Sequence, residues 1–201
     1  MHRVHFLNGK YGATRILKYA LSFVKENMLE KNKIREFDKE IYKHSSYQED
    51  AKELRRLFNY YLKYEYRDLI LDNLMSKYFN EKDLFESTYL STNNIKEMNN
   101  EGHIIGSHTE NHSVLSRLNY EEQKKEIESS LNYLMNICDE IDYKSFCYPY
   151  GYKSSYNQTT LKILDELGFH NAVIFDNEAQ GSIHDVYQLS RIDCNKFIEI
   201  L

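Results

Sequence analysis

Apolar residues recur at three- and four-residue spacing through the first half of the chain, which is typical of helices with one buried face. The spacing is clearest between residues 13 and 85, at Ile16, Leu17, Ala20, Leu21 and Val24, and again at Leu54, Leu57, Phe58, Tyr61 and Leu62. The charged residues of the second stretch are typical of solvated helix faces: Glu49, Lys52, Glu53, Arg55 and Arg56. We therefore expect residues 1–90 to form a helical subdomain.

From residue 91 the pattern changes to short elements in alternation. The predicted elements are a helix capped by Ser91 and Thr92 that stops at Gly102, a strand at 103–107, a helix at 120–137, a strand at 143–148, a helix at 159–167 closed by Gly168, and a strand at 172–175. Such alternation with short connections implies an α/β fold with a parallel sheet and crossover helices. Functional side chains are then expected at the carboxyl ends of the strands.

Size and composition narrow the classes of function. A chain of 201 residues suffices for one core domain with a helical appendage, and a net charge of -5 argues against nucleic-acid or membrane-surface binding. Three widely separated cysteines predict neither a disulfide framework nor a cysteine metal knuckle, and a reducing compartment fits them best. No secretion signal or membrane span is evident, so we expect a cytoplasmic protein.

The run Gly-Ser-His-Thr-Glu-Asn-His at residues 106–112 ends a predicted strand. If the chain turns into a helix there, His108 and His112 project from one side and can bind one metal ion. Ordinary surface or core histidines remain the alternative. The zinc peptidase signature requires glutamate directly after the first histidine, and Thr109 at that position argues against a peptidase.

The run Phe-Cys-Tyr-Pro-Tyr-Gly at residues 146–151 ends another predicted strand. Pro149 keeps Tyr148 extended and Gly151 permits a sharp turn, so the Tyr150 amide is a candidate donor to an oxyanion. The alternative is an ordinary turn that carries aromatic core residues.

These two motifs, in this order and about forty residues apart, resemble those of the polysaccharide deacetylases, also called NodB-homology proteins or family-four carbohydrate esterases. The family's His-Ser/Thr-x-x-His motif matches residues 108–112, and its Pro-Tyr motif matches residues 148–151. The resemblance covers residues 91–201. It implies a partial, distorted (β/α) barrel of NodB type, with residues 1–90 as an N-terminal helical insertion or subdomain.

The resemblance also implies a site and a substrate. A divalent metal, most often zinc, would be held by His108, His112 and an aspartate, with Tyr150 as backbone oxyanion donor. Tyr148, Pro149 and Asp193 would contact the substrate, which is an N-acetylated sugar of a polysaccharide or glycoconjugate. Residues 189–193 resemble a late strand of the barrel, where Asp193 is a candidate either to tune the site or to pair with Arg191.

Two parts of the family pattern are not matched. The motif Thr-Phe-Asp-Asp-Gly supplies the base and the third metal ligand, but no Asp-Asp pair occurs in this sequence. We therefore expect a chain that begins inside the domain. The Leu-x-His motif that supplies the acid is not matched at His184, and Glu110, Asp176 and Asp193 are equal candidates for the missing ligand.

Three hypotheses follow. The first is an N-acetyl-sugar deacetylase, inactive if the aspartate-bearing strand is missing. The second is a noncatalytic remnant that binds glycan or protein through its tyrosine-rich helices. The third is an unrelated α/β metal hydrolase, which would place His108 and His112 on different faces.

Overall fold

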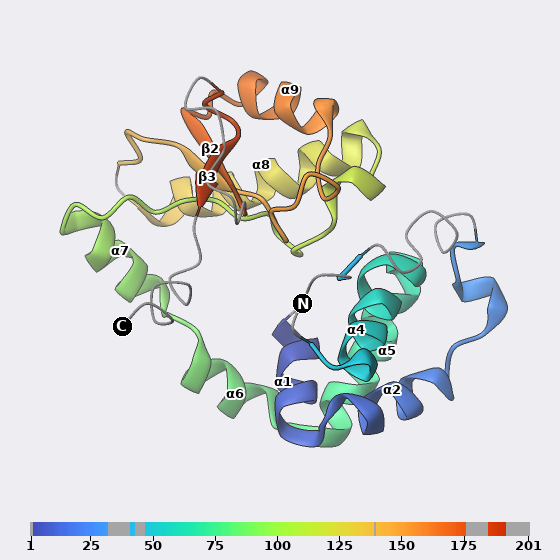
Figure 1. Cartoon of the computed structure of the whole chain (residues 1–201). Helices are drawn as coiled ribbons and strands as arrows, with labels where there is room; N and C mark the ends of the chain where they lie inside the picture. Colours follow the sequence, from blue (N-terminus) through green and yellow to red (C-terminus); the bar gives the residue numbers. More distant parts are fainter. Residues whose placement is uncertain (1, 32–40, 43–46, 139, 176–184, 192–201) are drawn as a thin grey trace, which may run out of the picture. The chain divides into compact units, whose positions relative to one another are not determined.

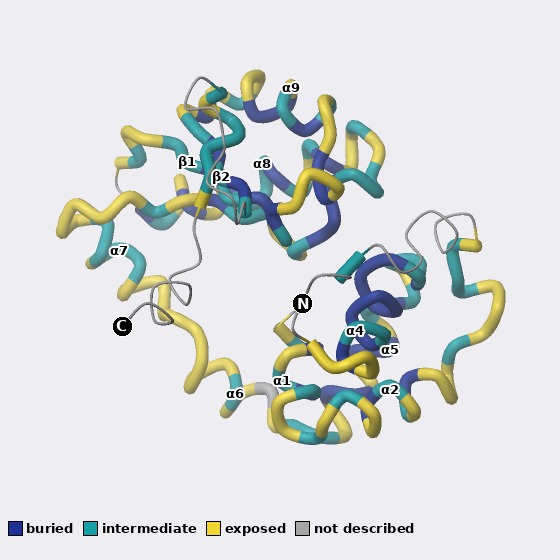
Figure 2. Tube along the Cα trace, viewed as in Figure 1, coloured by how far each residue is buried: buried dark blue, intermediate teal, exposed yellow. Residues whose placement is uncertain are grey.

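The computed structural model describes residues 2–31, 41–42, 47–138, 140–175 and 185–191 (Figure 1). The chain divides into two compact units, Met1–Tyr89 and Leu90–Leu201. Each unit has its own cluster of buried apolar side chains (Figure 2). No helix in the described ranges combines the length and the hydropathy needed to cross a membrane.

The first unit is helical, as the spacing of apolar residues predicts. Its elements are α1 (His2–Tyr11), α2 (Ala13–Leu21), the 3-10 turn η1 (Glu26–Met28), α4 (Glu49–Arg56), the π-helical turn η2 (Leu57–Tyr61), α5 (Tyr64–Tyr78) and α6 (Glu81–Thr88). Helix α1 packs against α2, α4 and α5. It begins before the predicted helical stretch, because Val4 and Leu7 are buried in the same core.

The predicted helix faces are largely confirmed in this core. Ile16, Ala20 and Leu54 are fully buried, and Phe58 is 1% exposed. Leu21 is 52% exposed, so the buried stripe of α2 is narrower than the sequence suggested.

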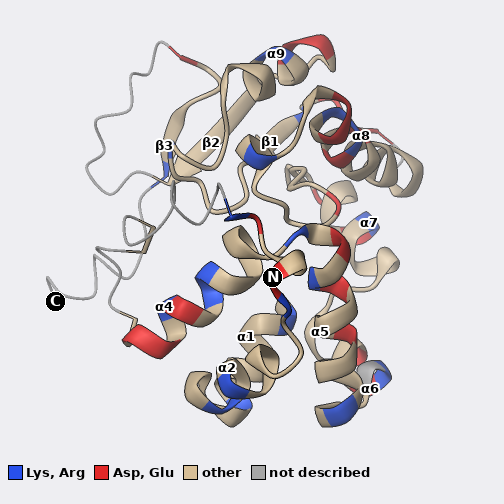
Figure 3. Cartoon of the chain, turned by 90° about the vertical axis from the view of Figure 1, so that its right-hand side faces the viewer, with Lys and Arg blue, Asp and Glu red and all other residues tan. Residues whose placement is uncertain are grey.

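The prediction that Arg55 and Arg56 lie on a solvated face is wrong, because each is only 4% exposed. Helix α4 carries both signs of charge (Figure 3), and Arg56 donates to the carboxylates of Glu49 at 2.9 Å and Glu53 at 2.6 Å. The Arg55 guanidinium lies 3.8 Å from the centre of the Tyr47 ring. Buried guanidinium groups are tolerated when such contacts replace water.

The second unit alternates helices and strands. Its elements are α7 (Thr92–Asn100), the 3-10 turn η3 (Leu115–Arg117), α8 (Tyr120–Ile137), β1 (Ser145–Cys147), α9 (Gln158–Glu166), β2 (Asn171–Phe175) and β3 (Leu189–Arg191). Side-chain caps fix the helix starts, with capping boxes at Ser91, Asn119 and Asn157. Gly102, at φ 87°, follows α7 as predicted.

The three strands form one parallel sheet in the order β1-β2-β3. The strand predicted at residues 103–107 is reduced to one isolated bridge between Ser107 and Phe146. Only Ser107 exchanges backbone hydrogen bonds with β1, whereas Ile104 is 65% exposed. The α/β class is confirmed; the barrel and the role of residues 1–90 as an insertion remain predictions.

Helices α8 and α9 pack together against one face of this sheet (Figure 1). The core between them contains Ile127, Leu131, Ile163, Leu164, Phe146, Ala172 and Ile174. The opposite face carries half-buried side chains, among them Cys147, Val173 and Leu189. This single helical layer buries one face of the sheet. Because the strands are parallel, their carboxyl ends lie at one edge of the sheet.

Acid should weaken the packing of α1 on α4. His5 Nδ1 lies 3.4 Å from Arg55 Nη2, and partial burial together with Arg55 lowers the pKa of His5 below 6.5. The unfolded chain then binds more protons than the folded one, so stability is lost as pH falls through 6.5. We expect the Tm to fall between pH 8 and pH 5, and to fall less in His5→Gln.

The matched control is His170→Gln, an exposed histidine of the second unit. Its Tm is measured over the same pH range, so that the effect of His5→Gln is compared with that of removing another histidine. Equal acid sensitivity in His5→Gln and the unchanged chain would contradict the assignment.

Candidate functional site

Both sequence motifs lie at the carboxyl edge of the parallel strands. His108 follows the Ser107 bridge, and the turn at residues 148–151 follows β1. The His108 and His112 ring centres are 4.7 Å apart, and the His112 and Tyr150 ring centres are 4.9 Å apart, both in edge-to-face geometry. The structure therefore brings the two imidazoles and Tyr150 into one cluster, unlike the different faces expected of an unrelated hydrolase.

His108 is oriented by the backbone of β1. Its Nδ1 lies 2.6 Å from the carbonyl oxygen of Cys147. A carbonyl oxygen only accepts, so Nδ1 carries the proton and Nε2 has the lone pair. A histidine that donates one ring N–H to a carbonyl and offers the other nitrogen is the usual arrangement of a metal ligand.

The helical turn considered as one possibility for residues 108–112 does not form, because this segment is an irregular loop. Thr109 has φ 64° and His112 has φ 54°, in the left-handed region that residues with a side chain seldom occupy. These two backbone reversals bring the imidazoles together in place of a helical turn. Of the four non-glycine residues with positive φ in the described ranges, three are Thr109, His112 and Tyr150. Such strain concentrates at functional sites.

Residues of helix α8 hydrogen-bond to this loop. The Glu126 carboxylate accepts from the Asn111 backbone and side-chain nitrogens, both at 2.9 Å, and its carbonyl accepts from the Glu110 amide at 3.0 Å. One turn later, the Ser130 hydroxyl pairs with that of buried Ser107 at 2.8 Å. Sequence reasoning missed Glu126 and Ser130. Their four-residue spacing within an amphipathic helix is a signal, but it does not reveal which loop they meet.

The turn after β1 has the geometry that its proline and glycine predict. Tyr150 and Gly151 are both left-handed, at φ 65° and 74°, and the Gly151 carbonyl accepts from the Phe175 amide at 2.9 Å. A Cβ on Gly151 would lie 2.6 Å from the Phe175 nitrogen, so only glycine fits there. The Tyr150 amide as oxyanion donor stays a prediction.

Tyr148 and Pro149 are both buried. The Tyr148 hydroxyl donates to the Tyr187 carbonyl at 2.8 Å, its ring stacks on Tyr156 at 4.2 Å, and burial raises its pKa. The Tyr148 side chain thus anchors the end of β1 in the core. Substrate contacts by Tyr148 and Pro149 remain predictions, and Asp193 lies outside the described residues.

Cys147 contributes its carbonyl rather than its thiol. Arg191 Nη1 donates to the Cys147 sulfur at 3.1 Å, but burial outweighs this contact and raises the pKa of the thiol. In the absence of metal, burial therefore makes this thiol harder to ionise than an ordinary one.

The two imidazoles fit a zinc site in part. Neutral imidazole nitrogens suit zinc, and catalytic zinc normally takes three protein ligands with one position open. In the part of the chain that the structure describes, no group of three or more His, Cys, Asp or Glu residues is placed to hold a metal. Glu110 is exposed. Asp176, His184 and Asp193 lie outside the described ranges.

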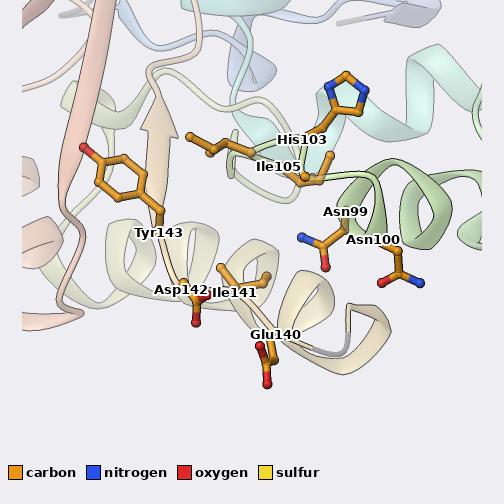
Figure 4. Close-up of a pocket in the computed structure, with 10 residues that line it drawn as sticks. Asn99, Asn100, His103, Ile105, Glu140, Ile141, Asp142 and Tyr143 are labelled. Atoms are coloured by element: carbon orange, nitrogen blue, oxygen red, sulfur yellow. The ribbon is translucent and has the colours of Figure 1, made fainter.

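A cavity of about 470 Å³ lies away from this cluster (Figure 4). It is lined by Asn99, Asn100, Gly102, His103, Ile104, Ile105, Glu140, Ile141, Asp142 and Tyr143. These segments precede Ser107 and β1, whereas the imidazoles follow Ser107. The cavity therefore lies at the amino ends of the strands, opposite the candidate site.

Substitution of Gly151 tests how closely the turn is packed. Gly151→Ala places a methyl group against the Phe175 backbone in addition to the left-handed penalty of about 1–2 kcal/mol. Gly102→Ala is the matched control, since it has φ 87° and nothing within 4 Å of the added Cβ. We expect Gly151→Ala to lower the free energy of unfolding by clearly more than Gly102→Ala in urea titrations. Equal losses of unfolding free energy in the two variants would show that the turn at Gly151 tolerates a side chain.

The sequence matches the polysaccharide deacetylase family over residues 71–172. No curated protein matches the chain. Among solved structures, the Streptococcus pyogenes deacetylase PplD in complex with acetate shares 25% identity with it. The alignment covers 55% of this chain and 47% of that chain, with a TM-score of 0.45. The chain therefore spans about half the length of that solved protein.

Proposed function

The chain belongs to the polysaccharide deacetylase family, and from this membership we propose that it carries part of a metal-dependent site that removes acetyl groups from N-acetylated sugars. The observation that supports the proposal best is the pair of imidazoles at the strand ends, His108 and His112. Their rings are 4.7 Å apart, and His108 is oriented by the Cys147 carbonyl.

In this proposal His108 and His112 hold a zinc ion through ring nitrogens, with Nε2 as the donor of His108. A bound zinc ion would supply a Lewis acid that lowers the pKa of water and polarises the acetamide carbonyl. The Tyr150 amide is proposed to donate a hydrogen bond to the carbonyl oxygen as negative charge develops on it. The reaction would add the hydroxyl of one water molecule to the acetyl carbon and its remaining hydrogen to the amide nitrogen, so that the C–N bond breaks and acetic acid and a free sugar amine are released.

A noncatalytic glycan- or protein-binding role is the second candidate. The observation that favours it is the lack of an Asp-Asp pair in the printed sequence, because the resemblance assigns the base and one ligand to that pair. The two candidates make the same prediction for metal binding and different predictions for amine release.

Metal binding tests the site without requiring catalysis. We expect one zinc ion per chain by calorimetry, and a large loss of affinity in His108→Ala and in His112→Ala. The loss should exceed the roughly 10- to 100-fold that removal of a supporting hydrogen-bond partner costs. His103→Ala is the control, because His103 is exposed at the other end of the strands. Unchanged zinc content in both site variants would contradict the assignment of His108 and His112 as zinc ligands.

Release of free amine from N-acetylglucosamine oligomers tests the reaction. Any amine release by the zinc-loaded chain should be lost in His108→Ala and His112→Ala and kept in His103→Ala, because only the first two change proposed metal ligands. Zinc bound at these histidines without amine release would reject catalysis by this chain alone and support the noncatalytic candidate.

A further inference from the structure

The amino-terminal helices carry an unusual excess of positive charge. Residues 1–25 contain five Lys or Arg residues and no Asp or Glu, although the whole chain has a net charge of -5. Met1–Tyr89 has 17 basic and 14 acidic residues, whereas Leu90–Leu201 has 9 basic and 17 acidic ones. The positive charge is thus concentrated on α1 and α2, which carry no carboxylate of their own (Figure 3).

Three tyrosines join these two helices to the end of α5. The Tyr11 and Tyr78 ring centres are 4.4 Å apart, and those of Tyr19 and Tyr78 are 6.1 Å apart. The Tyr11 hydroxyl donates to the Tyr78 carbonyl at 3.1 Å. All three side chains are half-buried and pack against the helical core, so the cluster is fixed in place.

Three exposed cations rest on this cluster. Lys77 Nζ lies 3.9 Å from the Tyr19 ring centre, Arg15 lies 5.6 Å from that of Tyr11, and Lys10 Nζ lies 5.6 Å from that of Tyr11. Among the described residues, none of the three cations pairs with a carboxylate, whereas Arg3 of the same helix as Lys10 pairs with Asp68 and Asp72. We call this set the basic aromatic surface; it comprises Lys10, Tyr11, Arg15, Tyr19, Lys77 and Tyr78.

A cation held against a ring loses less conformational freedom when it binds an anion than a free lysine or arginine does. The rings therefore keep three exposed cations beside one cluster of tyrosines. The surface offers positive charge beside aromatic groups, and its three cations have no carboxylate partner among the residues that the structure describes.

We propose that the basic aromatic surface binds an acidic polysaccharide, one whose sugars carry carboxylates. The positive charge favours a polyanion as the ligand. That this polyanion is a carbohydrate rests on the proposed function. A uronic acid unit presents a carboxylate for the cations together with hydroxyl groups for the tyrosines. Single-stranded nucleic acid binds by stacking bases on open aromatic faces, and here the cations already lie over the rings.

The test is binding of an oligogalacturonate to the full chain, compared with an uncharged N-acetylglucosamine oligomer and an oligonucleotide of equal charge. The variant replaces Lys10, Arg15 and Lys77 by Gln. The control replaces Lys82, Lys125 and Lys153 by Gln, which are also exposed and change the net charge equally. Exposed ion pairs are individually weak, so three together should change Kd by roughly tenfold.

We expect the oligogalacturonate to bind more tightly than both competitors, and its affinity to fall in the surface variant but not in the control. Equal losses of affinity in the two variants would show that net charge alone explains the binding, and would overturn the proposal. Tighter binding of the oligonucleotide would instead assign the surface to nucleic acid. The assay measures glycan binding and needs neither zinc nor catalysis. Failure of this proposal can therefore be distinguished from failure of the proposed deacetylase function.

Discussion

A short ladder of hydrogen bonds between Ser107 and β1 holds the candidate site together. The Ser107 amide donates to Ser145, the Cys147 amide donates to Ser107, and the Cys147 carbonyl then accepts from the His108 ring. Two motifs about forty residues apart in sequence are joined by these three contacts. Loss of the ladder would free both the loop that carries His112 and the imidazole of His108. The position and the tautomer of the first imidazole therefore depend on the same strand pairing.

The rest of the second unit supports that ladder. Helices α8 and α9 bury one face of the sheet. Glu126 of α8 hydrogen-bonds to the loop between the histidines, and Ser130 hydrogen-bonds to Ser107 just before it. These polar contacts offset the cost of the left-handed residues Thr109 and His112. The helix thus has two functions, since its apolar side closes the core and its polar residues shape the site.

The first unit has a different chemical character. Its core is built from helix faces, and its surface combines tyrosine rings with cations that lack carboxylate partners within the described ranges. The proposed acidic-glycan surface belongs to this unit, whereas the proposed zinc ligands belong to the second unit.

The sequence by itself determined the features that depend on neighbouring residues. Periodicity predicts α8 at residues 120–137 because it acts within a few residues along the chain. The motifs likewise identified His108 and His112 as candidates, and Gly151 as a turn. Only the tertiary structure decided how these residues meet. Residues 108–112 form a loop with two left-handed residues rather than the helical turn considered from the sequence, because Glu126 stabilises the loop from another element. Such a long-range contact cannot be read from the local sequence.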